Sequence, residues 1–364
     1  MRKGFSQHAR TALWMSCAVV LALLCRPAAA QIQIASQDGN TSLKLGVLGQ
    51  VWGDNLDTTT GDSSSKNLFL RRVRLIGLFK LDEHLSVFFD TDAPNLGKGN
   101  ADGTKNNADI FLQDFTVTYA FTKQFQLDGG MILLASGYNH NQSATSIMAI
   151  DLGPYTLLDS GPLTGRGGRD YGVQARGYLA DDHLEYRAGV FQGLRGKDST
   201  NAFRYTGRLA YYVFGPETGL TYRGTSLGKI QTLSLGGSFD VQKGYKNYDA
   251  DLFWDQPVNN GDGLTLQVDY AWWDGHTFLP AIPKQKTLLA ELGYYIHEIK
   301  LQPFLQYARQ KLDVAGPGEK RYQAGLGYYF KGYNSNLKLA WSRIERDAVK
   351  KRNEITMQYQ VFAF

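Results

Sequence analysis

Apolar and polar residues alternate with a period of two along most of this chain. In residues 264–272, for example, every second position is apolar or aromatic, and Thr265, Gln267 and Asp269 lie between those positions. Successive side chains of a β-strand point to opposite faces, so this pattern predicts strands with one apolar and one polar face. The pattern recurs in about 16 segments, each near the ~9–11 residues that a tilted membrane-crossing strand needs. The predicted strands are residues 42–54, 67–80, 84–92, 109–121, 125–134, 170–180, 183–193, 203–214, 229–242, 248–256, 263–274, 286–297, 300–313, 321–331, 336–346 and 353–364.

The connectors between these segments alternate between short and long. The short ones include residues 82–83 and 298–299, and the longest is 135–169. Outer-membrane barrels have short turns on one side and long loops on the other, and segment 215–228 is the one long connector on the turn side. We therefore predict an all-β fold, a 16-stranded antiparallel transmembrane β-barrel that closes with the strand ending at Phe364. A soluble β-sandwich or propeller is the alternative, although no fixed-period blade motif is visible.

Residues 1–30 have the pattern of a secretory signal peptide, with a basic start, an apolar stretch and Ala28, Ala29 and Ala30 at the end. We expect this segment to be removed, so that residues 31–364 form the barrel domain. A lipid-modified Cys25 and an uncleaved helical anchor are the alternatives. Both cysteines lie in this segment, so the mature chain has no disulfide and no thiolate metal site.

Charge placement is more informative than net charge. The formal net charge is +5, but the first 30 residues hold four basic residues and no acidic one, so the mature chain is nearly neutral. We therefore expect no nucleic-acid partner. Arginines and carboxylates lie at polar-face positions of several predicted strands. The candidate pore-lining and selectivity residues are Arg72, Arg74, Arg176, Arg187, Arg204, Arg208, Asp90 and Asp114, together with Arg166 in the longest connector.

An arginine cluster that lines a narrow pore favours anions, because guanidinium is always charged and its fork matches phosphate or carboxylate. The alternative is that each arginine pairs with a carboxylate on a neighbouring strand. Arg71 alternates with Val73 and Leu75, so we expect it to face outward near a rim. No cofactor, metal site or catalytic residue is predicted. A hydrolase remains an alternative, but the histidines lie in loops, turns or strand ends without a recognisable nucleophile motif.

Residues 69–79, 169–178, 184–193 and 204–211 resemble the phosphate-selective porin family of the porin O and porin P type. The resemblance implies a homotrimeric outer-membrane porin of 16 strands whose long loop, here residues 135–169, folds into the lumen. The phosphate-specific members carry many lysines and arginines at the constriction. Here the long loop has no lysine, and Arg166 and Arg169 lie only at its end. The resemblance therefore does not extend to phosphate specificity.

The function expected from these features is passive diffusion of small anions or polar solutes across the outer membrane of a Gram-negative bacterium. The expected partners are those solutes, outer-membrane lipid and lipopolysaccharide, and two further copies of the chain. An alternative is a barrel scaffold that sheathes a partner such as a multihaem cytochrome. The absence of cysteine from the mature chain excludes covalent haem attachment to the barrel itself.

Overall fold

The computed structural model describes residues 32–60, 62–107, 109–158, 167–313 and 316–364. The predicted signal peptide and Arg166 lie outside these residues. Two short 3-10 helices, η1 (Lys197–Ser199) and η2 (Asn259–Gly261), accompany the strands, and no helix in the described part is long and apolar enough to cross a membrane. The strands are β1 (Ile32–Ala35), β2 (Ser42–Asp57), β3 (Ser64–Lys80), β4 (Leu85–Asp92), β5 (Phe111–Ala120), β6 (Gln126–Leu133), β7 (Arg169–Leu179), β8 (Leu184–Phe191), β9 (Arg204–Phe214), β10 (Thr232–Gln242), β11 (Tyr245–Pro257), β12 (Gly263–Asp274), β13 (Gln285–Tyr295), β14 (Leu301–Leu312), β15 (Glu319–Tyr328), β16 (Phe330–Tyr333), β17 (Ser335–Arg346) and β18 (Arg352–Ala363).

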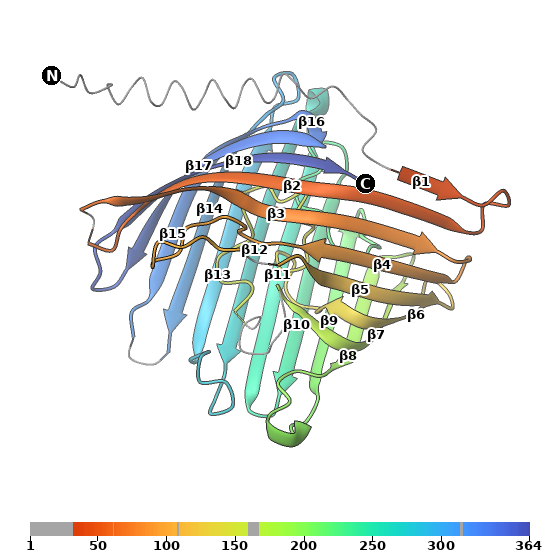
Figure 1. Cartoon of the computed structure of the whole chain (residues 1–364). Coiled ribbons are helices and arrows are strands. Elements are labelled where there is room, and N and C mark those ends of the chain that lie inside the picture. Colours follow the sequence, from red (N-terminus) through yellow and green to blue (C-terminus); the bar gives the residue numbers. More distant parts are fainter. Residues whose placement is uncertain (1–31, 61, 108, 159–166, 314–315) are drawn as a thin grey trace.

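Sixteen antiparallel strands, β2 to β15 with β17 and β18, form a closed barrel (Figure 1). Each strand pairs with the next along the chain, and β18 pairs with β2, so that Val361 lies opposite Gly49 and the barrel closes. The short β1 adds only a hairpin partner to one end of β2. The predicted strand ends agree with these strands to within three residues. The predicted 16-stranded barrel is therefore confirmed.

The outer face is apolar and the inner face is polar, as the alternation predicts. Tyr270 and Leu292 point outward and are 45% and 44% exposed, whereas Gln267 and Glu291 point inward and are buried. A polar inner face combined with an apolar outer face is the arrangement of a barrel that crosses lipid.

Strict alternation with Phe115, Val117 and Tyr119 predicts that Phe111 lies on the outer face of β5, and this prediction is wrong because a β-bulge shifts the register there. Asp90 lies opposite Asp114 and Thr91 opposite Leu112, so Gln113 is an extra residue on β5. As a result Leu112 is exposed on the outside, and both Gln113 and Asp114 are buried on the inside. Phe111, which pairs with Asp92 beyond the bulge, therefore does not continue the outer row of Phe115, Val117 and Tyr119. A bulge adds one residue to one strand and so reverses the faces beyond it.

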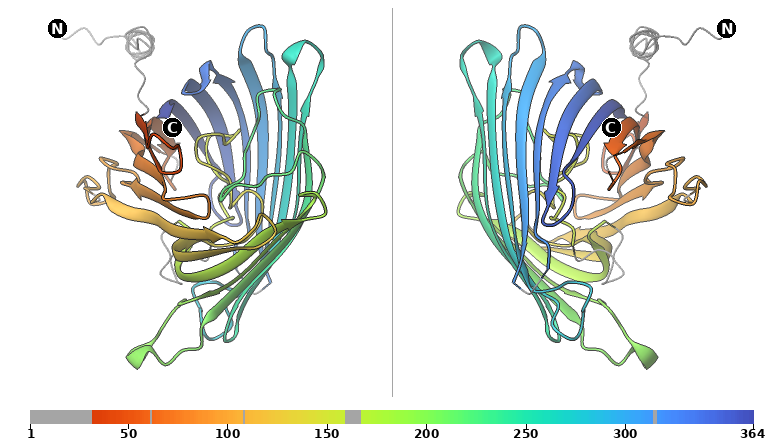
Figure 2. Two further views of the ribbon diagram at one scale, coloured as in Figure 1. Left: turned by 90° about the vertical axis from the view of Figure 1, so that its right-hand side faces the viewer. Right: turned by 90° about the vertical axis from the view of Figure 1, so that its left-hand side faces the viewer.

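The long connectors lie at one end of the barrel and most of the short turns at the other. The connector between β6 and β7 spans residues 134–168, and its described residues, 134–158 and 167–168, are called the long loop below. It starts at the end of the barrel that carries the long connectors and turns back into the barrel interior, where it is drawn in yellow (Figure 2). The inward-folding loop that the resemblance implies is thus present.

Candidate pore constriction

The long loop is buried inside the barrel. Its residues Tyr138, Asn139, Asn141 and Ala149 have no exposed surface. Met148, Ala149 and Ile150 form one apolar cluster with wall residues, namely Trp52, Phe69, Phe304 and Ala340. This cluster is unusual for a polar lumen, and it gives the middle of the loop a fixed position against the wall by apolar burial.

Wall side chains also satisfy the polar backbone of the long loop. A buried carbonyl without a partner is costly, so an inward loop needs donors from the wall. Lys338 Nζ on β17 donates to the carbonyl oxygens of Ile147 and Ala149. Two glutamines do the same nearby: Gln50 Nε2 lies 3.1 Å from the Ala144 oxygen and Gln360 Nε2 lies 3.0 Å from the Thr145 oxygen.

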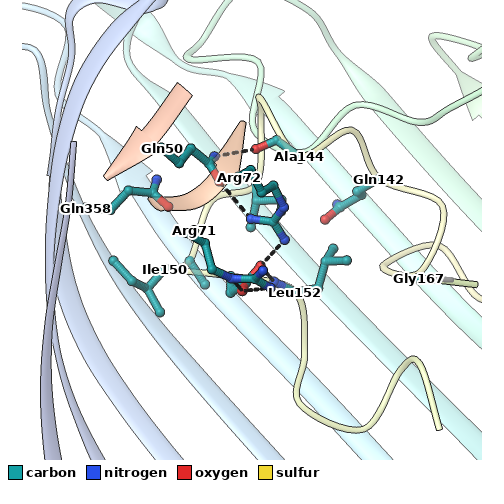
Figure 3. Close-up of polar contacts among 12 residues, drawn as sticks. Gln50, Arg71, Arg72, Gln142, Ala144, Ile150, Leu152, Gly167 and Gln358 are labelled. Atoms are coloured by element: carbon teal, nitrogen blue, oxygen red, sulfur yellow. Dashed lines mark hydrogen bonds and ion pairs between the residues drawn. The ribbon is translucent and has the colours of Figure 1, made fainter. Parts of the chain in front are cut away.

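Asp151 of the long loop is held by two arginines of β3. Figure 3 labels these arginines, Arg71 and Arg72, beside Ile150 and Leu152, the two neighbours of Asp151 in the chain. Arg71 Nε lies 2.8 Å from Asp151 Oδ2, and a terminal nitrogen of Arg72 lies 2.6 Å from Oδ1. Arg72 also donates to Gln50 Oε1 at 2.8 Å. Burial opposes ionisation of Asp151, but the two guanidinium groups outweigh it and hold the pKa of Asp151 well below its usual range. This carboxylate therefore stays charged and anchors the loop to the wall.

The expectation that Arg71 faces outward is wrong, again because of a β-bulge. Gln50 of β2 lies opposite Arg72, while the next residue, Val51, lies opposite Leu70. Arg71 is the extra residue between these pairs. The bulge directs it to the same carboxylate as Arg72, and the Trp52 ring centre lies 5.4 Å from its guanidinium carbon. Sequence alternation assigned it to the opposite face because one inserted residue is invisible without the paired strand.

Every predicted arginine that the structure describes points inward and pairs with a carboxylate. Arg74 is 3.0 Å from both Asp90 and Asp92, and Asp114 is 2.9 Å from Arg169 rather than from one of the predicted arginines. The other pairs are Arg176 with Asp128 at 2.8 Å, Arg187 with Glu185 at 2.7 Å, Arg204 with Asp240, and Arg208 with Asp251 at 2.6 Å. Arg204 and Arg208 are almost fully buried. Their charges are locally balanced, unlike those of Arg71 and Arg72, which share one carboxylate.

A second segment, residues 215–228, also enters the lumen, from the other end; it is called the inward turn below. Its backbone meets that of the long loop: the Ser143 N–H donates to the Tyr222 oxygen and the Tyr222 N–H to the Asn141 oxygen, both at 2.8 Å. The Tyr222 ring stacks on Tyr138 with ring centres 4.8 Å apart. The two connectors thus form one polar and aromatic contact inside the barrel.

Wall residues hold the inward turn in place. Arg187 donates to the carbonyl oxygens of Gly219 and Leu220 at 3.1 and 3.0 Å, and Tyr222 Oη donates to Glu185 at 2.9 Å. Arg187 was predicted as a pore-lining candidate, and its described contacts are with Glu185 and this turn. The sequence marked segment 215–228 only by its length on the turn side. Its inward path was not predicted, because no residue pattern in it distinguishes a buried turn from an exposed one.

The described residues contain no group of three or more His, Cys, Asp or Glu side chains arranged to hold a metal ion. Two of the histidines contact backbone carbonyl oxygens through Nδ1. In the lumen, His140 lies 2.9 Å from the Thr156 carbonyl oxygen, and at the turn end His84 lies 2.8 Å from that of Ala120.

The barrel is similar to several solved porins. The anion-selective porin from Comamonas acidovorans aligns with a TM-score of 0.61 and 12% identity, over 88% of this chain and 99% of that one. Salmonella typhi OmpF, solved in complex with daunomycin, aligns with a TM-score of 0.57 and 16% identity, over 90% and 100%. The outer-membrane channel DcaP of Acinetobacter baumannii aligns with a TM-score of 0.57 and 12% identity, over 90% and 99%. No family model and no curated protein matches the sequence. At these identities the likeness concerns the fold, and that fold is the closed barrel of outer-membrane porins.

Proposed function

We propose that this protein is an outer-membrane channel through which small solutes diffuse passively. The observation that carries the proposal is an inward loop fixed to the polar wall of a closed barrel whose outer face is apolar. A loop anchored inside a barrel narrows the path, and solute selection then depends on width and wall charge. The structural similarity to porins and an outer-membrane channel from three bacteria supports an outer-membrane location for this chain.

We further propose a preference for anions that depends on Arg71 and Arg72. Most of the described lumen arginines pair with a carboxylate of their own, so the two opposite charges of each pair largely cancel in their effect on a passing ion. At Asp151 two guanidinium groups meet one carboxylate, which leaves local positive charge beside the long loop. One similar structure is an anion-selective porin, which agrees with this preference. A homotrimer and a phosphate preference, both implied by the resemblance to phosphate-selective porins, remain predictions.

Planar-bilayer recording of the purified protein tests both parts of the proposal. Stepwise conductance is expected, and a folded barrel that never produces steps would refute the channel. Under a salt gradient the reversal potential should indicate anion preference, and Arg71→Gln should move it toward cations. Arg343→Gln is the matched control, because Arg343 lies on the outer face of β17, paired with Glu345 at 3.1 Å. An equal shift in both variants, or none in either, would refute the role of Arg71.

The cytochrome-sheath alternative needs a lumen wide enough for a partner. The long loop and the inward turn of this chain meet inside the barrel and are buried there. This arrangement favours the channel over the sheath. Co-purification of a cytochrome with the native barrel would reverse that preference.

A further inference from the structure

The inward turn covers polar wall residues on one side of the barrel, near the end with the short turns. The Ser226 N–H of the turn donates to Asp255 of β11 at 2.6 Å. Thr225 Oγ1 accepts hydrogen bonds from Thr265 of β12 at 3.1 Å and from Gln302 of β14 at 3.0 Å. These three wall residues are at most 2% exposed. On this side, therefore, the turn removes the polar wall from contact with a passing solute.

The wall on the other side of the barrel, at the same end, is apolar and partly exposed. In the strand order β3 lies across the barrel from β11. Leu78 of β3 lies opposite Phe88 of β4, and Phe362 of β18 lies opposite Leu48 of β2. Leu78, Phe88 and Phe362 are partly exposed, as is Phe364 at the end of the chain. These four residues, Leu78, Phe88, Phe362 and Phe364, are called the apolar strip below.

The register places the apolar strip on the inner face of the barrel. On β3 it continues the inward row of Arg74, and on β18 it continues the inward row of Gln360, which donates to the long loop at 3.0 Å. Gly46 of β2 lies between these two parts, and a Cβ atom at this position would lie only 2.8 Å from that of Phe364. The missing side chain allows the apolar surface to continue from β18 to β4, across three inter-strand spacings or about 14 Å.

Lys44 of β2 supplies a positive charge within the apolar strip. Its Nζ lies 4.5 Å from the centre of the Phe364 ring, and its side chain is partly exposed. Among the described residues Lys44 forms no ion pair. The inner carboxylate that follows the strip on β4, Asp90, is only 3% exposed, and Lys80 at the strand end is followed by two acidic residues that offset its charge. Lys44 is therefore the charged side chain that a solute on the strip would contact.

The distribution of polar and apolar residues at this end is the reverse of what solvation favours. The polar wall residues are buried beneath the inward turn, whereas the apolar strip remains accessible in a lumen that is otherwise polar. Contiguous exposed apolar side chains are typical of binding sites. Small-molecule sites combine an apolar and aromatic lining with a few polar groups that orient the ligand. Three phenylalanines and one lysine have this composition.

We propose that the apolar strip is a solute subsite of the channel and that its solutes are small aromatic carboxylates. The ring of the solute packs against the phenylalanines of the strip, and its carboxylate lies at Lys44. This inference rests on the proposed function, because the strip acts on a solute that passes through the lumen. It adds a second step of selection: Arg71 and Arg72 select by charge beside the long loop, and the strip selects by the aromatic body.

Planar-bilayer recording with benzoate tests the subsite. Benzoate should interrupt the chloride current of the unmodified channel, and acetate at the same concentration should not. One aromatic contact is worth about fivefold in affinity, so Phe88→Thr with Phe362→Thr should need about 25-fold more benzoate for equal interruption. Phe330→Thr is the matched control, because Phe330 is an exposed residue at the same end of the barrel, in β16, with its ring centre 4.8 Å from that of Tyr328. This control should respond to benzoate as the unmodified channel does.

Replacing Lys44 separates the charge of the solute from its ring. Lys44→Gln should weaken the effect of benzoate about threefold and leave that of the neutral benzyl alcohol unchanged. It also tests the subsite if the double variant does not fold, as judged by heat-dependent gel mobility. Interruption by benzylammonium as strong as that by benzoate, or an unchanged benzoate effect in Lys44→Gln, would refute the carboxylate as the group that the strip orients.

The outcomes separate this proposal from the channel proposal. Equal interruption by acetate and benzoate, or an undiminished benzoate effect in the double variant, would refute the apolar strip as the subsite and leave the channel intact. Saturation-transfer NMR of the barrel in lipid nanodiscs measures benzoate binding without conduction. Benzoate binding that is lost in the double variant, by a barrel that shows no conductance, would refute the channel and leave the strip intact as a binding site.

Discussion

Replacing Asp151 with asparagine should release the long loop from the barrel wall. The exchange keeps the shape of the side chain and removes the one carboxylate that Arg71 and Arg72 share at 2.7 and 2.6 Å. Breaking a buried ion pair from one side costs about 3–5 kcal/mol because the remaining charges stay unpaired. Asp151 is 20% exposed, so the lower figure of about 3 kcal/mol applies. Each 1.4 kcal/mol is a factor of ten, so the released population should rise by about a hundredfold.

Single-channel recording measures this change directly. Asp151→Asn should show larger current fluctuations than the unmodified protein and a stronger anion preference, since two arginines remain without their carboxylate. Asp102→Asn is the matched control, because Asp102 lies in an exposed loop and its carboxylate accepts hydrogen bonds from the nearby Thr104. Quiet, unshifted currents in Asp151→Asn would refute the view that this ion pair fixes the loop.

The pH dependence of the same recordings has a defined sign. The pKa of Asp151 is depressed in the folded protein, so its stabilisation is fully present above the ordinary carboxyl pKa near ~3.9. It is lost only as the pH falls below that value toward the folded pKa. The unmodified channel should therefore remain quiet from neutral pH down to about pH 4. Current fluctuations that begin well above that pH would contradict the claim that ionised Asp151 holds the long loop on the barrel wall.

Three further predictions concern the other lumen contacts. Arg204→Gln and Arg208→Gln should each lower the free energy of unfolding by about 3 kcal/mol, measured by denaturant titration, and should shift the reversal potential less than Arg71→Gln does, because each is paired and buried. Replacing residues 216–227 with a short Gly-Ser turn should raise the single-channel conductance, because the inward turn leaves the lumen; shortening the exposed loop at 197–201 is the control. Burial raises the pKa of Glu217 in the inward turn, so protonation of Glu217 stabilises the turn in its buried position inside the lumen. The single-channel conductance should therefore fall as the pH drops through that raised pKa. The variant Glu217→Gln should lose this pH dependence, and an unchanged dependence would exclude Glu217 as its source.

The strands were predictable because each one carries its own signal. Leu264 to Trp272 alternate with Thr265 to Ala271 whatever their neighbours are, so the faces follow from one segment alone. The bulges at Arg71 and Gln113 were not predictable, because a single extra residue has meaning only against the register of the paired strand. The same limit applies to ion pairs. Arg208 and Asp251 are 43 residues apart, and only the strand order brings them to 2.6 Å.

This limit decides where selectivity should be sought. The sequence does not distinguish the predicted inward arginines from one another, since each of them occupies a polar-face position, and it places Arg71 on the opposite face. The structure separates arginines whose charge is balanced by a carboxylate from those whose charge is not. Arg176, Arg187 and Arg208 each have a carboxylate at hydrogen-bonding distance, so the electric field of each pair on a passing ion is close to that of a dipole. A dipole's field falls off faster with distance than that of an uncompensated charge. The site at Asp151, where two guanidinium groups share one carboxylate, is therefore the position in the described lumen where a single exchange should change ion preference most.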